Sequence, residues 1–180
     1  MLYHAYEFQR QLASPVRLWA NALEQAYTSP YNPLSETWIG KSVAAGAEIV
    51  ARLTQNYGKP HFGLATTQIG NETVEVNEEI LVRKPFCDLV RFRRDTIRRD
   101  PKVLVVAPMS GHFATLLRGT VEALLPEHEV HITDWKDARE VPVTSGDFSL
   151  DDYIDYVIAF CRYLGPDVHV IAVCQPSVPV

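Results

Sequence analysis

The stretch that decides the fold is Val103-Leu104-Val105-Val106-Ala107, a run of five apolar residues bounded by Lys102 and Pro108. Continuous apolar runs of this length are typical of a β-strand that is covered on both faces, as happens in parallel sheets. We therefore predict that this run is a buried strand at the centre of an α/β domain.

Downstream of this run the chain alternates between helical and strand patterns. A loop at residues 108–111 leads into a predicted helix over about 112–125, and a strand follows at 129–133. Ser149 is a candidate N-cap for a further helix that ends before Gly165-Pro166, and an apolar strand then runs to residue 173. Helical crossovers are the short way to join parallel neighbours, so these three strands predict a parallel sheet.

Upstream, residues 62–92 indicate short strands that are separated by turns. Gly70-Asn71 is a hairpin-turn pair between residues 62–69 and 73–76, and further strands are predicted at 80–83 and 87–92. We interpret this region as an antiparallel meander at one edge of the larger sheet. The predicted fold is therefore α/β, with a mostly parallel sheet and an antiparallel meander at its N-terminal side.

The first sixty residues are predicted to be helical and to form a segment separate from residues 61–180. Ser14-Pro15 is a candidate start of a first helix, whose apolar stripe would be Leu12, Val16, Trp19, Leu23 and Tyr27. A second helix is predicted over about 35–57, with these buried positions: Trp38, Val43, Ala47, Ile49, Val50 and Leu53. We favour packing of this helical pair on a neighbouring domain or a partner; contact of its aromatic residues with an apolar surface is the alternative.

Composition narrows the class of protein. The chain has 180 residues, 47% of them hydrophobic, and a formal net charge of −5, which gives no overall attraction for nucleic acid. No run approaches the ~20 apolar residues that a membrane span requires, and the N-terminus lacks the pattern of a signal peptide. Three cysteines form neither a disulfide framework nor a zinc spacing, which favours a reducing cytoplasm.

The strand over residues 167–173 runs directly into Cys174-Gln175-Pro176, a layout typical of a nucleophile elbow. Cys174 is the candidate nucleophile, and the dipole of a following helix would favour its thiolate. The backbone N–H of Gln175 is a candidate oxyanion donor, and Met109, in the loop after residues 103–107, is the second. The alternative is that Cys174 is a small buried hydrophobe that closes a strand.

Other reactive side chains have weaker cases. Ser110 and His112 are adjacent to a turn and are better explained by loop geometry and helix capping than as a catalytic pair. Asp134 and Asp137 follow a strand and are expected to be solvated, and His169 is expected to pack within a strand. Cys161 is expected in the core. No Gly-x-Gly-x-x-Gly motif follows a strand, which disfavours a dinucleotide cofactor.

Four segments together resemble the intracellular polyhydroxyalkanoate depolymerases, and the resemblance runs from the first residue to the last: 84–87 (Lys-Pro-Phe-Cys), 105–118, 132–139 and 173–176 (Val-Cys-Gln-Pro). It implies an α/β-hydrolase fold that cleaves ester bonds of stored poly(3-hydroxybutyrate) on granules in the bacterial cytoplasm. The family's cysteine elbow maps onto Cys174, and its Asp and His are expected beyond Val180. Residues 61–180 would then be the N-terminal half of the hydrolase domain, incomplete at the C-terminus and inactive alone, and the chemistry needs neither metal nor organic cofactor.

Two alternatives remain open. Polyhydroxyalkanoate synthases are similar in fold and also use a cysteine, usually within a Gly-x-Cys-x-Gly box. Ala172 and Pro176 occupy the glycine places here, which favours the depolymerase. The second alternative is a module that binds the granule polymer without catalysis.

Overall fold

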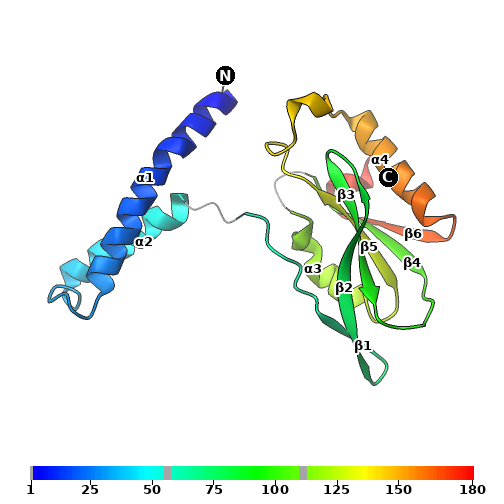
Figure 1. The fold of residues 1–180 in the computed structure, drawn as a ribbon, viewed down its shortest axis with the longest axis horizontal. Coiled ribbons are helices and arrows are strands. Elements are labelled where there is room, and N and C mark those ends of the chain that lie inside the picture. The colour runs from blue at the N-terminus through cyan, green and yellow to red at the C-terminus, as the bar shows by residue number, and fades with distance from the viewer. Residues whose placement is uncertain (1, 55–57, 110–112) are drawn as a thin grey trace. The chain divides into compact units, whose positions relative to one another are not determined.

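The computed structural model describes residues 2–54, 58–109 and 113–180, with side chains described from residue 15 onward. The chain divides into two compact units, Met1–Gly58 and Lys59–Val180 (Figure 1). Within the described residues, no helix combines the length and the apolar character that crossing a membrane demands.

The first unit consists of helices α1 (Leu2–Thr28) and α2 (Trp38–Thr54), which pack against each other. The prediction that a helix starts at Ser14-Pro15 is wrong, because α1 continues through Pro15. A proline removes one backbone hydrogen bond, and a helix of 27 residues can tolerate that loss. In the connection, Asn32 Nδ2 donates to the Ala26 carbonyl at 2.9 Å, and Asn32 Oδ1 accepts from the Leu34 N–H at 2.9 Å.

Small residues occupy the buried positions of this unit. The buried positions among the described side chains are Ala20, Gly40, Ala47 and Ala51. A Cβ at Gly40 would lie 1.9 Å from the Leu34 carbonyl oxygen, so only glycine fits there. The predicted burial is therefore wrong for four large residues of α2, which are exposed: Trp38, Ile49, Val50 and Leu53. Val43 is half-buried. Close helix approach through small side chains leaves the large ones at the outside.

The second unit is built on a six-stranded mixed sheet of strand order β1-β2-β3-β5-β4-β6. Its strands are β1 (Thr66–Ile69), β2 (Glu72–Arg83), β3 (Cys87–Arg94), β4 (Lys102–Val106), β5 (Glu129–Trp135) and β6 (Val168–Ala172). Pairings β1–β2, β2–β3 and β3–β5 are antiparallel, whereas β4 pairs in parallel with both β5 and β6. The predicted meander and the predicted parallel strands are confirmed.

The expectation of a mostly parallel sheet is wrong for the described strands, because three of their five pairings are antiparallel. The meander β1-β2-β3 forms half of the sheet and lies at one edge of it, as predicted. Residues 73–76 and 80–83, which were predicted as separate strands, belong to the single 12-residue strand β2, with a register shift between Ile80 and Val82. Gly70, at φ 60°, and Asn71 form the predicted hairpin turn between Ile69 and Glu72.

Helices connect the parallel strands. The 3-10 turn η1 (Ala114–Leu117) and α3 (Arg118–Leu124) join β4 to β5, and α4 (Leu150–Leu164) joins β5 to β6. The predicted cap of α4 is confirmed as a capping box, in which the Ser149 side chain accepts from the Asp152 N–H and the Asp152 carboxylate accepts from the Ser149 N–H. β4 lies between β5 and β6, so the two crossovers run in opposite directions, and right-handed connections place α3 and α4 on opposite faces of the sheet.

The core of this unit surrounds β4. Residues 103–107 are buried on both faces, as the apolar run predicted. The rest of the core comes from residues between Phe62 and Leu164, including Tyr153, Val157 and Phe160 on the buried stripe of α4. No described residue of the first unit belongs to this cluster. The sheet unit therefore has its own core. A site is expected beyond the carboxyl ends of the parallel strands.

Candidate active site

The chain turns sharply immediately after β6. Val173 N–H donates to the Val106 carbonyl at 3.3 Å, so pairing with β4 extends to the residue before Cys174. Cys174 then has φ 65° and ψ −117°, and it is the one non-glycine residue with positive φ in residues 2–54, 58–109 and 113–180. A residue with a Cβ pays about 1–3 kcal/mol for such a conformation, which persists only where the surroundings enforce it.

Hydrogen bonds on the far side of the turn hold this conformation. Ser177 donates twice to the Cys174 carbonyl, from its N–H at 3.1 Å and from its Oγ at 2.7 Å, while Pro176 is buried beneath the turn. The Cys174 side chain is exposed. The alternative that Cys174 is a buried hydrophobe is therefore wrong.

The helix expected after the cysteine is a short 3-10 turn, η3 (Gln175–Ser177). The effect of a following helix on the Cys174 thiolate therefore stays a prediction. The backbone turn itself is the feature observed at Cys174.

Both predicted oxyanion donors lie beside this turn. Because β4 and β6 are parallel neighbours, their carboxyl ends meet at one edge of the sheet, which is where ligands bind in open α/β sheets. The Met109 N–H donates to Gln175 Oε1 at 3.2 Å. A side-chain carbonyl therefore occupies the donor that an oxyanion would use, an arrangement that sequence reasoning did not anticipate. The backbone N–H of Gln175 has no acceptor among the described residues.

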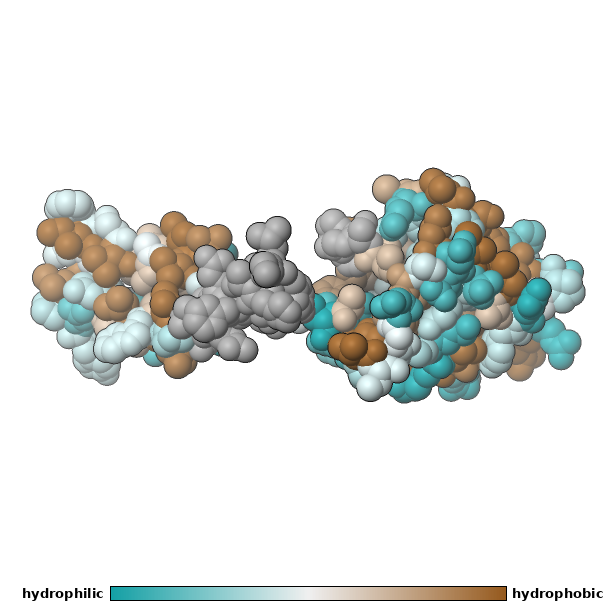
Figure 2. Space-filling model, turned by 90° about the horizontal axis from the view of Figure 1, so that it is seen from above, coloured by the Kyte–Doolittle hydropathy of each residue, from teal (hydrophilic) through white to brown (hydrophobic). Residues whose placement is uncertain are grey.

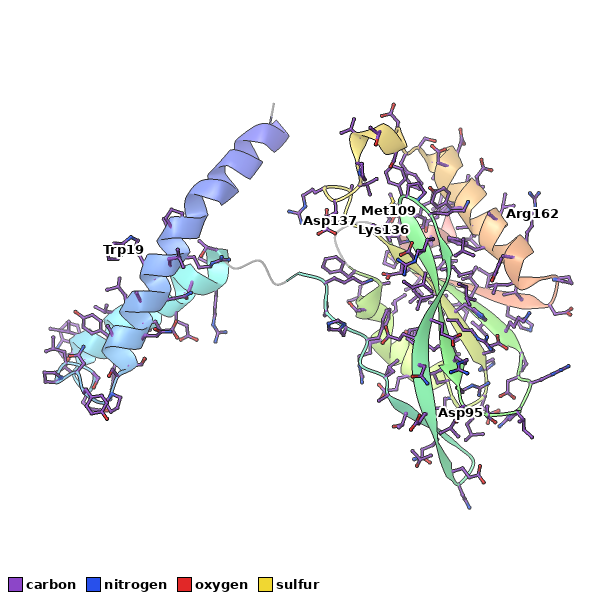
Figure 3. All side chains as sticks on the ribbon, viewed as in Figure 1. Trp19, Asp95, Met109, Lys136, Asp137 and Arg162 are labelled. Carbon is purple, nitrogen blue, oxygen red and sulfur yellow. The ribbon has the colours of Figure 1, made fainter. Side chains whose placement is uncertain are left out.

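A pocket of about 550 Å³ opens at the same edge of the sheet. Figure 3 shows Met109, Lys136 and Asp137 together at this end, and Asp95 and Arg162 away from it. Met109 connects the pocket to the turn at Cys174, because it lines the pocket and its N–H bonds to Gln175. The lining residues come from four separate segments: Phe86, Met109, Phe113, Trp135, Lys136, Asp137, Ala138, Arg139 and Phe148.

Aromatic contacts fix the walls of this pocket. Trp135 donates from Nε1 to the Ala107 carbonyl at 2.9 Å and stacks on Tyr153 with ring centroids 4.4 Å apart. Phe86 and Phe148 lie 4.6 Å apart, centroid to centroid. The strand pattern predicted Asp134-Trp135 at this edge of the sheet. It did not predict that Phe86 and Phe148 would line the pocket, because both lie outside strands and helices.

Charged side chains behind the pocket are paired. Asp88 on β3 and Asp134 on β5 are direct cross-strand partners, and both are buried. Lys136 Nζ lies 2.9 Å from Asp88 Oδ1, and Lys59 pairs with Asp134. The expectation that Asp134 is solvated is therefore wrong. The expectation for Asp137 is wrong too: it is half-buried and accepts from Arg139 Nε at 2.9 Å to each carboxylate oxygen.

The remaining candidates lie elsewhere. Cys87 is buried at the start of β3, where burial raises the pKa of its thiol well above the usual value, with Asp134 and Asp88 adding to the rise. Cys161 is half-buried in α4, and burial raises its pKa as well. His169 is exposed on β6, so its predicted packing is wrong. Ser110 and His112 lie outside the described residues.

No protein-family model, curated protein sequence or solved structure matches this chain. Among the described residues, no group of three or more His, Cys, Asp or Glu side chains is placed to hold a metal ion. The turn at Cys174, the Met109 donor and the aromatic pocket are thus the features from which a function can be argued.

Proposed function

We propose that this chain carries the nucleophile-bearing half of an α/β-hydrolase domain that cleaves ester bonds of intracellular poly(3-hydroxybutyrate)-type polyesters. The observation that carries the proposal is the positive-φ turn at Cys174, directly after a parallel strand and beside the Met109 N–H. Strand-to-turn strain of this kind presents a nucleophile at the edge of an α/β-hydrolase sheet. The resemblance supplies the substrate class and the granule location.

The chemistry runs through an acyl-enzyme. The Cys174 thiolate attacks the ester carbonyl carbon, the S–C bond forms, and the backbone N–H groups of Met109 and Gln175 stabilise the oxyanion. The C–O bond then breaks, and the leaving alkoxide oxygen takes a proton from the protonated histidine to become the hydroxyl end of the released polymer. Water activated by the same histidine hydrolyses the thioester and frees the thiol. The resemblance implies that this histidine and its aspartate lie outside residues 1–180.

Occupation of the Met109 donor by Gln175 fits a resting state. The substrate oxygen must displace Gln175 Oε1 to reach the Met109 N–H, and the amide can then return to solvent because Gln175 is exposed. Gln175 would in this way satisfy the donor until a carbonyl arrives.

The test is hydrolysis of amorphous poly(3-hydroxybutyrate) granules by the protein encoded by the whole gene, with Cys174→Ala compared to wild type. Loss of the nucleophile should lower the rate by about 10³-fold or more, while binding to granules persists. Cys161→Ala is the matched control, since Cys161 lies half-buried in α4. Unchanged hydrolysis by Cys174→Ala would remove the assigned nucleophile.

Polymer synthesis is the second candidate, because synthases of similar fold also use a cysteine. The two glycine places of the Gly-x-Cys-x-Gly box are occupied here by Ala172 and Pro176. Ala172 ends β6 in register with Val106, and Pro176 is buried. Release of 3-hydroxybutyrate from granules supports hydrolysis, whereas incorporation from its coenzyme A thioester supports synthesis. Granule binding with neither reaction supports the non-catalytic module.

A further inference from the structure

We propose that the pocket at the carboxyl ends of β4 and β5, whose nine lining residues are given above and which we call the aromatic pocket, binds an uncharged segment of an aliphatic ester chain. This inference rests on the proposed function, because the segment is the part of the polymer next to the ester that Cys174 attacks. It adds the residues that would bind the segment, which the resemblance does not supply.

The first step is position. Met109 is one of the residues that line the aromatic pocket. Its backbone N–H donates a hydrogen bond to the side-chain oxygen Oε1 of Gln175, the residue that follows Cys174. A carbonyl oxygen on the Met109 N–H would therefore lie at the mouth of the aromatic pocket. The chain on one side of that carbonyl has this pocket as its nearest apolar space.

The second step is the character of the walls. Four aromatic side chains and Ala138 supply apolar surface, in a volume of about 550 Å³ that falls within the range of small-ligand sites. Trp135 is held on both sides, by Tyr153 stacking and by its bond to the Ala107 carbonyl, so this wall is formed before a ligand arrives. Apolar, pre-formed walls suit a methyl-substituted aliphatic chain.

The third step is charge. Lys136 donates to the Lys84 carbonyl at 2.7 Å and pairs with Asp88, while Arg139 makes two contacts with Asp137. A carboxylate or phosphate ligand would have to compete with Asp88 and Asp137 for these cations, and Asp88 is buried beside Lys136. An ester is neutral and leaves them in place. The pairing therefore favours an uncharged ester segment over an anionic chain end or a coenzyme A thioester.

The experiment measures binding to the 180-residue chain carrying Cys174→Ala, so that no ligand is consumed. Trp19→Phe and Trp38→Phe in the same chain leave Trp135 as the fluorescent reporter. The probes are a 3-hydroxybutyrate trimer capped as its methyl ester and the same trimer as the free acid. We expect the methyl ester to quench Trp135 with a dissociation constant at least about threefold lower than that of the free acid, and to change little between about 0.05 and 0.5 M salt.

A substitution that fills the space provides the matched pair. Ala138→Trp places a ring in the aromatic pocket from an exposed position, and Ala123→Trp adds the same ring at an exposed position of α3. Because each variant carries a second tryptophan, its binding is measured by calorimetry. We expect Ala138→Trp to weaken binding of the methyl ester about tenfold or more, and Ala123→Trp to leave it unchanged.

Three results overturn the inference: free acid binding as tightly as the ester or more tightly, no binding of the ester, or no effect of Ala138→Trp. The proposed function fails separately. If the ester binds as expected but the whole-gene protein cleaves no polyester, the aromatic pocket stands without the hydrolase. If cleavage occurs and Ala138→Trp changes neither binding nor KM, the hydrolase stands without the pocket.

Discussion

Gln175 contributes a side chain and a backbone N–H to the same few ångströms around the thiol. If its side-chain carbonyl occupies the Met109 donor, then Gln175→Ala should free that donor for an incoming carbonyl. We expect chloroacetamide, which has a carbonyl, to alkylate Cys174 several-fold faster in Gln175→Ala than in wild type. Methyl methanethiosulfonate has no carbonyl, so its rate should not change.

The ratio of these two rates is the measurement, since it cancels any general change in exposure of the thiol. Gln175→Glu keeps an acceptor at the same place and should retain the wild-type ratio. Gln68→Ala, on exposed β1, is the control. A ratio that falls in Gln175→Ala would mean that the side chain holds Met109 in place rather than covering it.

His131 makes the stability of the second unit depend on pH. Its side chain is 1% exposed on β5, where burial lowers its pKa, an effect opposed by Glu129 and reinforced by Arg91. The unfolded chain binds a proton below about pH 6.5 while the folded chain resists it, so the unfolding free energy falls as pH decreases below that value. The loss approaches about 1.4 kcal/mol per pH unit until the folded pKa is reached.

Denaturant unfolding at pH 7.5 and 5.5 tests this sign. His131→Met removes the titrating group and should reduce the difference in unfolding free energy between the two pH values. His169→Asn, at an exposed position of β6, should leave that difference as in wild type. A difference that stays the same in His131→Met would assign the pH dependence to other groups.

At the residue scale, sequence reasoning succeeded where the chemistry is local. Cys174, Gln175 and Met109 could be named because an apolar strand followed by a nucleophile, and the loop after a central strand, are local patterns. Asp134 could not, because its cation, Lys59, lies 75 residues away along the chain. The aromatic pocket was missed for the same reason, since its lining is gathered from four segments by the sheet topology.

The pairing of β3 with β5 places two carboxylates opposite each other, and their repulsion is offset by Lys136 and Lys59. Asp88 and Asp134 are buried cross-strand partners, and like charges in that relation are destabilising. Lys59→Met should leave Asp134 facing Asp88 with one cation fewer. We expect a loss of about 1–3 kcal/mol of unfolding free energy, less than for a fully buried pair because Lys59 is half-exposed.

A double-mutant cycle isolates this effect. Asp134→Asn in the Lys59→Met background should recover part of the stability, because it removes the uncompensated charge. Arg93→Met is the control, since Arg93 and Glu79 form an exposed pair between β3 and β2, for which about 0–1 kcal/mol is expected. Equal losses from Lys59→Met and Arg93→Met would show that the pair at Asp134 has no special weight.

At the element scale, the predictions that held were those with a local cause. The turn at Gly70-Asn71, the cap at Ser149 and the apolar run of β4 each come from a few adjacent residues. The predictions that failed depended on partners far along the chain. The stripe of α2 was expected to be buried, yet the buried described positions of the helical unit are Ala20, Gly40, Ala47 and Ala51, which periodicity of large apolar residues does not reveal.

The two units differ in how much apolar surface they bury. The sheet unit has a continuous core that begins at Phe62, while the described buried residues of the helical unit are alanines and one glycine. Figure 2 shows extensive hydrophobic surface on the helices, and Trp19 and Trp38 are 73% and 78% exposed. Two helices with so small a shared interior gain little stability from each other. The helical unit is therefore suited to covering its large apolar side chains with another apolar surface.

In the proposed function that surface is the polyester granule, and Trp19 and Trp38 are the residues to test. Replacing both with Glu places charge where apolar contact is needed, at positions exposed enough that the helices should survive. We expect co-sedimentation of the whole-gene protein with amorphous poly(3-hydroxybutyrate) granules to fall by about tenfold, while hydrolysis of a soluble trimer ester is unchanged, because the sheet core uses no described residue of this unit. Ala22→Glu with Ala45→Glu adds the same charge at exposed small residues and should leave sedimentation unaffected. If the two double variants sediment alike, the tryptophans do not bind the polymer. If the tryptophan variant loses activity on the soluble ester, the helices act on the sheet unit.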